Sequence, residues 1–485
     1  MKRLLALVLL VCFAFGAVAA QADTEVKMSG DARIYANFWS KYNYTGWDAQ
    51  GKQTYDSTTI WERFRLKTDF IANEGLKFRL GIRVNDTPWG KSTFTVDNPA
   101  VVIQVYQAFL QFKWPNTDIK FDIGLQDFDL PLSVDWLGAN PVLGGTHAAA
   151  AVVEIPVVEQ LKIVTGFTRM LDSSATSGFQ ANTTNKSNDF DGYFLTLPIT
   201  LDGFQATPWG LLAVAGKDAN YANTWVGNGG PNTNESLATN LFSLGTAAVA
   251  PGLKNNQEVF WWVGTTLSVT ALDPFKFYAD IMYGQGNMDE HKKDRRSGMF
   301  FDVAAEYTGL DMVTPQLTFW WSTGEQGGIN SGSERMPSVV NYWGPSNSFL
   351  FDTNQDFNVG QMPTNSTGSM GVVFALEKIS FFKDLTHRLT FSYARGTNSP
   401  NALREANLLT GVGGYVQMGR DLTYNEYSVG INFDNTYQIY ENLALILETG
   451  WAHGDYQKSV WGRRFVNQAN DGDAWKAAIG LKYKF

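Results

Sequence analysis

Residues 475–485, WKAAIGLKYKF, alternate strictly between two kinds of side chain. Every second residue from Trp475 to Phe485 is apolar, and the residues between them are lysine, glycine or alanine. Successive side chains of a β-strand point to opposite faces, so this period of two predicts a strand with one apolar and one polar face. An edge strand of a soluble sheet shows the same pattern, so the rest of the chain has to decide between the two settings.

Segments with the same period recur along the whole chain, joined alternately by short and long connections. The short connection 72–75, for example, joins 58–71 to 76–86. We count 18 such segments, and merging the two weak segments 147–155 and 161–170 gives the alternative of 16. Bacterial barrels have even strand numbers, short periplasmic turns and longer extracellular loops. The sequence therefore predicts one domain over residues 23–485, an all-β transmembrane antiparallel β-barrel of 18 strands. Further predicted strands are 26–39, 101–113 and 118–126.

Aromatic residues gather at the ends of the predicted strands, where interface girdles of membrane barrels lie. The set at the short-turn ends comprises Trp114, Phe275, Phe277, Phe381, Phe382, Tyr437, Tyr440, Tyr483 and Phe485. The set at the long-loop ends comprises Phe38, Trp39, Trp61, Trp261, Trp262, Trp320, Trp321 and Trp451. The core of a soluble β-sandwich gives aromatics less reason to favour strand ends, so this distribution favours lipid on the outside.

The N-terminus has the pattern of a Sec-type signal peptide. Lys2 and Arg3 precede an apolar run of roughly 15 residues, too short to cross a bilayer as a helix, and A-x-A spacings follow. We expect cleavage near Ala22, so that residues 1–22 are removed. Cys12, the single cysteine, lies inside this segment, which excludes disulfides and cysteine–metal sites from the mature chain. The mature chain keeps 36 basic against 47 acidic residues, and this balance argues against nucleic acid as a partner.

One predicted hairpin, 58–71 with 76–86, carries six basic residues on the face opposite its apolar one. A midplane Arg or Lys facing lipid costs about 2–4 kcal/mol, so this face should line water. The turn predicts that Arg63 opposes Arg83 and that Lys67 opposes Arg79. We interpret the column as a basic ladder that sets the field of the pore; the alternative is an inner wall that is merely solvated. The ladder comprises Arg63, Arg65, Lys67, Lys77, Arg79 and Arg83.

The third long loop, near 127–146, is unusually apolar for an exposed connection, which predicts that it folds inward against the barrel wall. Its acids Asp127, Asp129 and Asp135 are candidates to oppose the basic ladder across a constriction. The alternative is an outer loop that shields a contact between copies of the chain. The other long loops, 325–368 among them, are rich in Asn, Gly, Ser, Thr and Asp and are expected to be exposed.

Together these features resemble the trimeric general porins of outer membranes. The terminal strand, with Leu481, Tyr483 and Phe485, resembles the signal that barrel assembly machinery recognises. Segments 300–307 and 332–337 resemble the homotrimeric porins of Desulfovibrio-type sulfate reducers. The resemblance implies a homotrimer in the outer membrane of a Gram-negative bacterium, in contact with lipid and lipopolysaccharide. The acidic third-loop signature of enterobacterial porins is not reproduced.

Passive diffusion of small hydrophilic solutes and ions is the function that these features favour, with a preference for anions. The resemblance to sulfate-reducer porins implies small oxyanions as plausible solutes. Such a channel needs a polar lumen, a constriction and a field, and no cofactor or metal. One alternative is a substrate-specific sugar-type channel, for which Phe109 and Trp320 are possible inward aromatics. Another is a structural or adhesive barrel. An enzyme is not expected, because the four histidines are scattered and no nucleophile or nucleotide motif occurs.

Overall fold

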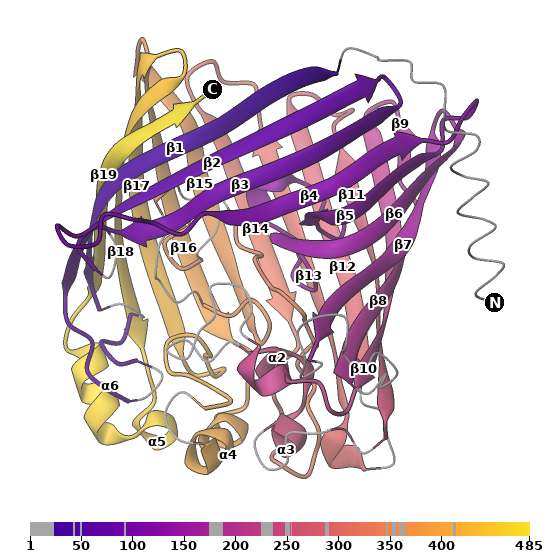
Figure 1. The fold of residues 1–485 in the computed structure, drawn as a ribbon. Helices are drawn as coiled ribbons and strands as arrows, with labels where there is room; N and C mark the ends of the chain where they lie inside the picture. Colours follow the sequence, from indigo (N-terminus) through magenta and orange to yellow (C-terminus); the bar gives the residue numbers. More distant parts are fainter. Residues whose placement is uncertain are drawn as a thin grey trace.

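A computed structural model shows a closed antiparallel β-barrel (Figure 1). It describes residues 24–41, 44–48, 51–91, 94–173, 188–224, 236–247, 253, 255–286, 291–345, 348–351, 356–357, 364–410 and 414–485. The predicted signal segment, 1–22, lies outside these residues. No helix in the described ranges has the length and apolar character needed to cross a bilayer.

The strands run in sequence order around the barrel. They are β1 (Glu25–Ser40), β2 (Ser57–Asn73), β3 (Leu76–Pro88), β4 (Gln104–Lys113), β5 (Lys120–Phe128), β6 (Thr146–Val158), β7 (Leu161–Asp172), β8 (Asp189–Thr196), β9 (Ile199–Leu201), β10 (Phe204–Gly216), β11 (Gln257–Val269), β12 (Phe275–Gly286), β13 (Arg296–Tyr307), β14 (Thr314–Ser322), β15 (Ser369–Phe382), β16 (Leu385–Gly396), β17 (Tyr427–Tyr440), β18 (Leu443–Asp455) and β19 (Ala474–Lys484).

The barrel is closed because β1 pairs with both β2 and β19. The short β8 and β9 both pair with β7 and with β10, one on each side of Leu197 and Pro198. They are the two halves of one strand, interrupted where Pro198 has no N–H to give to a ladder. Eighteen strands therefore complete the circuit, as the sequence predicts.

Short helices lie in the long connections. They are η1 (Asp135–Leu137), η3 (Tyr221–Asn223), α2 (Leu237–Leu241), α3 (Leu244–Ala247), η4 (Lys292–Asp294), α4 (Pro400–Thr410), α5 (Lys458–Trp461) and α6 (Arg463–Asn470). The helices α2 to α6 gather at the end of the barrel away from the C-terminus (Figure 1). We call this end the long-loop end and the opposite one the short-turn end.

The alternation in 475–485 places its apolar side chains outside. Trp475, Ile479 and Leu481 are 43–53% exposed, whereas Lys476 and Ala478 are buried on the inner face. Tyr483 and Phe485 are exposed as well, and the Phe485 amide and carbonyl exchange hydrogen bonds with Gly30 of β1. The last strand thus closes the barrel edge, and its outward apolar face suits lipid.

Exposure divides the predicted aromatic girdles. All nine aromatics of the short-turn set are exposed. In the long-loop set, Phe38 is exposed but Trp39, Trp262 and Trp320 are buried and face inward. Adjacent residues point to opposite faces of a regular strand, so in the neighbouring aromatic pairs of the long-loop set only one member can face lipid. The inward members belong to a large apolar cluster inside the long-loop half of the barrel.

Candidate pore constriction

Seven basic side chains share the inner face of the first three strands; an eighth on that face, Lys27, pairs with Glu25 at 3.3 Å at the start of β1 and is not counted with them. Alternation from the inward Tyr35 on β1 and from Asp69 on β2 assigns them to this face. We call this set the basic wall: Arg33 on β1; Arg63, Arg65 and Lys67 on β2; Lys77, Arg79 and Arg83 on β3. It contains the whole predicted ladder and adds Arg33, which sequence reasoning missed although it follows Asp31 at the same period.

The register of the second hairpin differs from the predicted one by two residues. Arg65 opposes Arg83 and Asp69 opposes Arg79, whereas we expected Arg63 opposite Arg83 and Lys67 opposite Arg79. The strands continue almost to a tight turn, with Asn73 paired to Leu76, so the connection is shorter than the four residues assumed. The observed register sets an acid against Arg79 and leaves one like-charged pair directly opposed, which is the more stable arrangement.

Acids on the same three strands neutralise part of the basic wall. Asp69 binds Arg79 at 2.6 Å and lies 3.7 Å from Lys77. Asp31 lies between two guanidinium groups, 2.8 Å from Arg63 and 2.6 Å from Arg65. Charge-assisted pairs of this kind fix the long side chains in place.

A third acid, Asp86 on β3, completes the set. It accepts hydrogen bonds from the Arg33 guanidinium, at 2.9 Å from Nε, and lies 3.9 Å from Arg63. Apart from the Lys27–Glu25 pair, three carboxylates on β1–β3 therefore face the seven cations of the basic wall. Arg83 stacks over Tyr106 at 5.4 Å and donates to Gln104 at 3.2 Å. In the described part of the chain no carboxylate lies within ion-pair distance of Arg83, so its charge stays uncompensated.

The three predicted loop acids differ in position. Asp127 lies in β5 rather than in the loop, 4.0 Å from Lys67, and accepts from Gln107 at 2.7 Å. Asp129 is the first residue after β5 and accepts a hydrogen bond from the backbone N–H of Thr146 at 3.3 Å; burial raises the pKa of Asp129. Asp135 begins η1 and is exposed, with no ion pair to any described residue. The structure therefore brings one of the three, Asp127, to the basic wall.

The connection between β5 and β6 reaches a distant part of the barrel wall. The backbone N–H of Ser133 donates to Asp280 on β12 at 3.0 Å, and its hydroxyl donates to the same carboxyl at 2.5 Å. Trp136 packs edge-on against Tyr278 of β12, with ring centroids 5.9 Å apart. Since β12 lies far around the ring from β5, this loop, 129–145, crosses the interior of the barrel.

The described residues of a second long connection, 323–368, also lie inside the barrel, where we expected an exposed loop. Trp343 donates to Asp302 on β13 at 2.8 Å, and Phe351 packs against Trp320 at 5.2 Å. The loop contains Met336, Val339, Val340, Trp343, Phe349, Leu350 and Phe351, all buried. This apolar content within a Gly- and Ser-rich stretch was the available signal, outweighed by the surrounding polar composition.

Farther along, the same connection reaches the first and last strands. Phe357 stacks on Tyr35 of β1 with ring centroids 4.6 Å apart, and the Asp356 carboxylate pairs with Lys482 of β19. The backbone N–H of Asp356 donates to Glu448 of β18 at 2.6 Å, and its carbonyl accepts from Arg33. The connection thus contacts the wall from β13 to β1, and its Asp356–Phe357 segment lies beside the basic wall.

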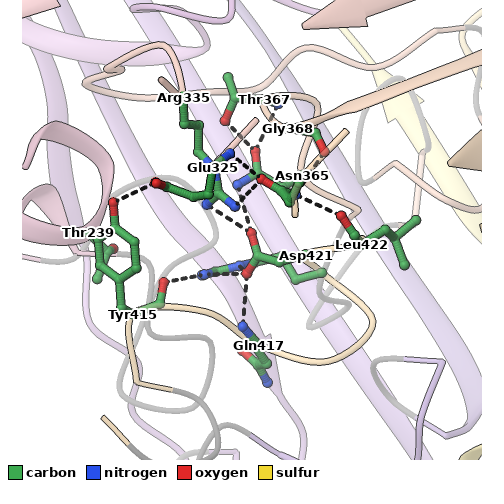
Figure 2. Close-up of polar contacts among 12 residues, drawn as sticks. Thr239, Glu325, Arg335, Asn365, Thr367, Gly368, Tyr415, Gln417, Asp421 and Leu422 are labelled. Carbon is green, nitrogen blue, oxygen red and sulfur yellow. Dashed lines mark hydrogen bonds and ion pairs between the residues drawn. The ribbon is translucent and has the colours of Figure 1, made fainter. Parts of the chain in front are cut away.

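A buried charged cluster fixes the loops at the long-loop end (Figure 2). Asp421 binds Arg335 at 3.0 Å and Arg420 at 2.8 Å, and all three are at most 3% exposed. Burial alone raises the pKa of Asp421, but the two guanidinium groups outweigh it and hold that pKa below its usual value. Tyr415 donates to Glu325 at 3.0 Å. The cluster joins 323–368 to the connection between β16 and β17.

A polar cavity of about 590 Å³ opens beside the unpaired cation of the basic wall. Its lining includes Arg83 and Asp86 from β3, His147 from β6 and Tyr342 from the second inward loop. The possible inward aromatics are both buried: Phe109 lies under Arg79, and Trp320 is covered by Phe351. These two aromatics are therefore covered by other side chains and do not offer an open aromatic surface to the lumen.

Comparison with known proteins shows the fold. Neither the family models nor the curated proteins searched gave a match to the sequence. Among solved structures, Acinetobacter baumannii OccAB2 is similar at 10% identity and a TM-score of 0.51, over 96% of this chain and 98% of that one. Pseudomonas aeruginosa OccK2, solved in complex with glucuronate, is similar at 10% identity and a TM-score of 0.50, over 95% and 98%. The chain has the fold of these barrels.

Proposed function

We propose that this chain forms a water-filled channel in the outer membrane of a Gram-negative bacterium for small hydrophilic solutes, with a preference for anions. The observation that carries the proposal is the basic wall, where seven cations face three carboxylates on the same strands and a fourth, Asp127, on β5 inside a closed barrel. A channel requires this separation between an apolar outer face and a polar, charged inner face.

The excess of positive charge on this wall matters more than the net charge of the chain, which is −9. A constriction concentrates the field of the nearest charges, and these decide which ions enter. The two inward connections, 129–145 and 323–368, narrow the lumen, so permeating solutes pass close to the basic wall. Both arguments support a lumen that favours anions.

A solute-selective channel is the second candidate, because the cavity beside Arg83 is large enough for a small organic anion. The complex of OccK2 with glucuronate makes a sugar acid a sensible first probe. Small oxyanions are the other solute class, suggested by the resemblance to sulfate-reducer porins. Saturable block of the conductance by glucuronate would favour selectivity, whereas block absent up to high concentration would favour general diffusion.

The test is reconstitution of the protein in planar bilayers and measurement of the reversal potential across a KCl gradient. We expect discrete conductance steps and a reversal potential of the sign that anion preference produces. Preference for cations would contradict the assignment of selectivity to the basic wall. Absence of any conductance would favour a structural or adhesive barrel instead.

Several expectations stay predictions from the sequence resemblance. They are assembly as a homotrimer, contact with lipopolysaccharide, recognition of the last strand by barrel assembly machinery, and signal cleavage near Ala22. Chemical crosslinking in native membranes and mass determination of the mature N-terminus would test the first and the last.

A further inference from the structure

Two carboxylic acids face each other inside the barrel wall. Asp280 on β12 and Asp302 on β13 are register partners, and they are 1% and 0% exposed. Their carboxyl groups are in hydrogen-bonding contact with each other. The Asp302 Oδ1 atom is buried and accepts from no described N–H or hydroxyl donor, so a carboxyl proton is the donor that fits it.

The groups packed around this pair carry no charge. On the strands that flank the pair, Thr266 of β11 is the register partner of Asp280, and Trp320 of β14 is the register partner of Asp302. From the loops, Ser133 faces Asp280 and Trp343 faces Asp302. Tyr278 also lies on β12, two residues before Asp280. Among the described residues, no Lys, Arg or His contacts either acid.

The nearest charged groups on the same strands are Lys276 and Glu306, which pair with each other at 3.3 Å. They lie nearer the short-turn end, four residues away on each strand. Each carboxyl of the buried pair therefore has the other carboxyl as its ionisable neighbour. Two carboxylates in contact without a cation cannot both ionise, and the pair keeps one proton between them.

Each acid also holds one of the two inward connections. Asp280 accepts two hydrogen bonds from Ser133 in 129–145, and Asp302 accepts one from Trp343 in 323–368. The two connections bond to each other as well, from Val339 N–H to the Val142 carbonyl at 2.7 Å and from Gly344 N–H to the Leu137 carbonyl at 2.9 Å. The carboxyl pair is thus a shared attachment point for both.

We propose that Asp280 and Asp302 form a pH-sensitive latch that holds both inward connections across the lumen and releases them when the shared proton is lost at alkaline pH. Ionisation of the second carboxyl places two like charges in contact in a buried site, and access of water relieves the repulsion. Water reaches the site when Ser133 and Trp343 leave it. The inference rests on the channel function proposed above, because it describes how the same constriction is regulated.

Single-channel conductance measured from pH 5 to pH 10 tests the latch. We expect a constant conductance at acidic and neutral pH and a rise at alkaline pH. Asp302→Asn should lose that rise, because the amide oxygen still accepts from Trp343 while the amide N–H donates to an ionised Asp280. Glu306→Gln is the matched control on the same strand and should keep the rise.

Hydrogen exchange of residues 130–143 and 339–344, corrected for the intrinsic effect of pH, gives a second readout that needs no conduction. We expect faster corrected exchange at alkaline pH in the unchanged protein and loss of that acceleration in Asp302→Asn. If Asp302→Asn does not fold, Asp280→Asn serves, since its amide N–H donates to Asp302.

The outcomes separate the two proposals. Exchange that accelerates in a protein that never conducts would overturn the channel and support the latch. Conductance without alkaline acceleration of exchange, or the same alkaline rise in Asp302→Asn as in the unchanged protein, would overturn the latch and leave the channel standing.

Discussion

Neutralising Arg83 should weaken anion preference more clearly than removing a positive charge elsewhere. Arg83 is the basic-wall cation without a carboxylate partner in the described chain, so Arg83→Gln removes a charge that nothing offsets locally. For an ion passing at about 8 Å in water, one unit charge contributes about 0.5 kcal/mol, which screening at 0.1 M salt reduces to about half.

Removing the charge changes the electrostatic free energy of a passing anion and of a passing cation by equal amounts of opposite sign. The difference between these two free energies therefore changes by about 0.5 kcal/mol. This corresponds to about a two-fold fall in the anion-to-cation permeability ratio, and to a larger fall if ions pass closer to the wall. The assay is the reversal potential in a KCl gradient at low total salt, repeated at high salt, where the difference should shrink.

Two variants serve as controls. Arg83→Lys keeps the charge and should keep the ratio, because a lysine ammonium supplies the same unit charge without the guanidinium fork. Lys113→Gln removes a charge from the exposed short-turn end of β4, and we expect a smaller change there. A ratio that stays the same in Arg83→Gln, or that falls equally in Lys113→Gln, would refute the assignment of selectivity to the basic wall.

Three further predictions concern the inward connections. Phe357→Ala removes the stack on Tyr35 and about 3–5 kcal/mol of packing, so single-channel conductance should rise; an unchanged conductance would place Phe357 outside the conducting path. Asp421→Asn leaves Arg335 and Arg420 buried without their shared carboxylate, which should cost about 3–5 kcal/mol and make the loops at that end sensitive to protease at neutral pH. The pKa of Asp421 lies below its usual value of 3.8, so its ion pairs should stabilise the loops fully above pH 3.8 and lose that stabilisation only as the pH falls through the lowered pKa. Pepsin digestion from pH 5 to pH 2 measures the stability of the loops. Sensitivity of the loops to pepsin already at pH 5 would contradict the prediction.

The strands could be predicted from sequence because lipid enforces strict alternation. Residues 475–485 face the bilayer on one side and the interior on the other, so their pattern has few interpretations. The boundaries of the predicted segments 58–71 and 161–170 fall within two residues of those of β2 and β7. The strand count also agrees, once Pro198 is recognised as an interruption inside a strand.

Partners across the lumen could not be predicted in the same way. The acids that neutralise the basic wall, Asp31, Asp69 and Asp86, lie on the wall itself, and pairing them requires the register to within a single residue. Register depends on turn length, which the sequence at 72–75 leaves ambiguous. The inward position of 323–368 was missed because loop composition reports polarity and does not report which solvent surrounds the loop.

The similarity to OccAB2 and OccK2 shows the fold and leaves the resemblance to sulfate-reducer porins a prediction. At 10% identity, no residue role transfers from those barrels to this one. The basic wall, the inward connections and the carboxyl pair are therefore argued from this chain's own contacts.

The burial of wall aromatics beneath 323–368 has a consequence for engineering. Trp262, Phe300 and Trp320 point into the barrel, where in a hollow pore their positions would carry polar side chains, and the connections that cover them keep them dry. Deleting such a connection to obtain a wider nanopore would expose these apolar side chains to the water of the pore. Water would leave the part of the pore that these aromatics line, or other apolar molecules would bind there. A wider pore would therefore require polar replacements for the inward aromatics as well as removal of the connection.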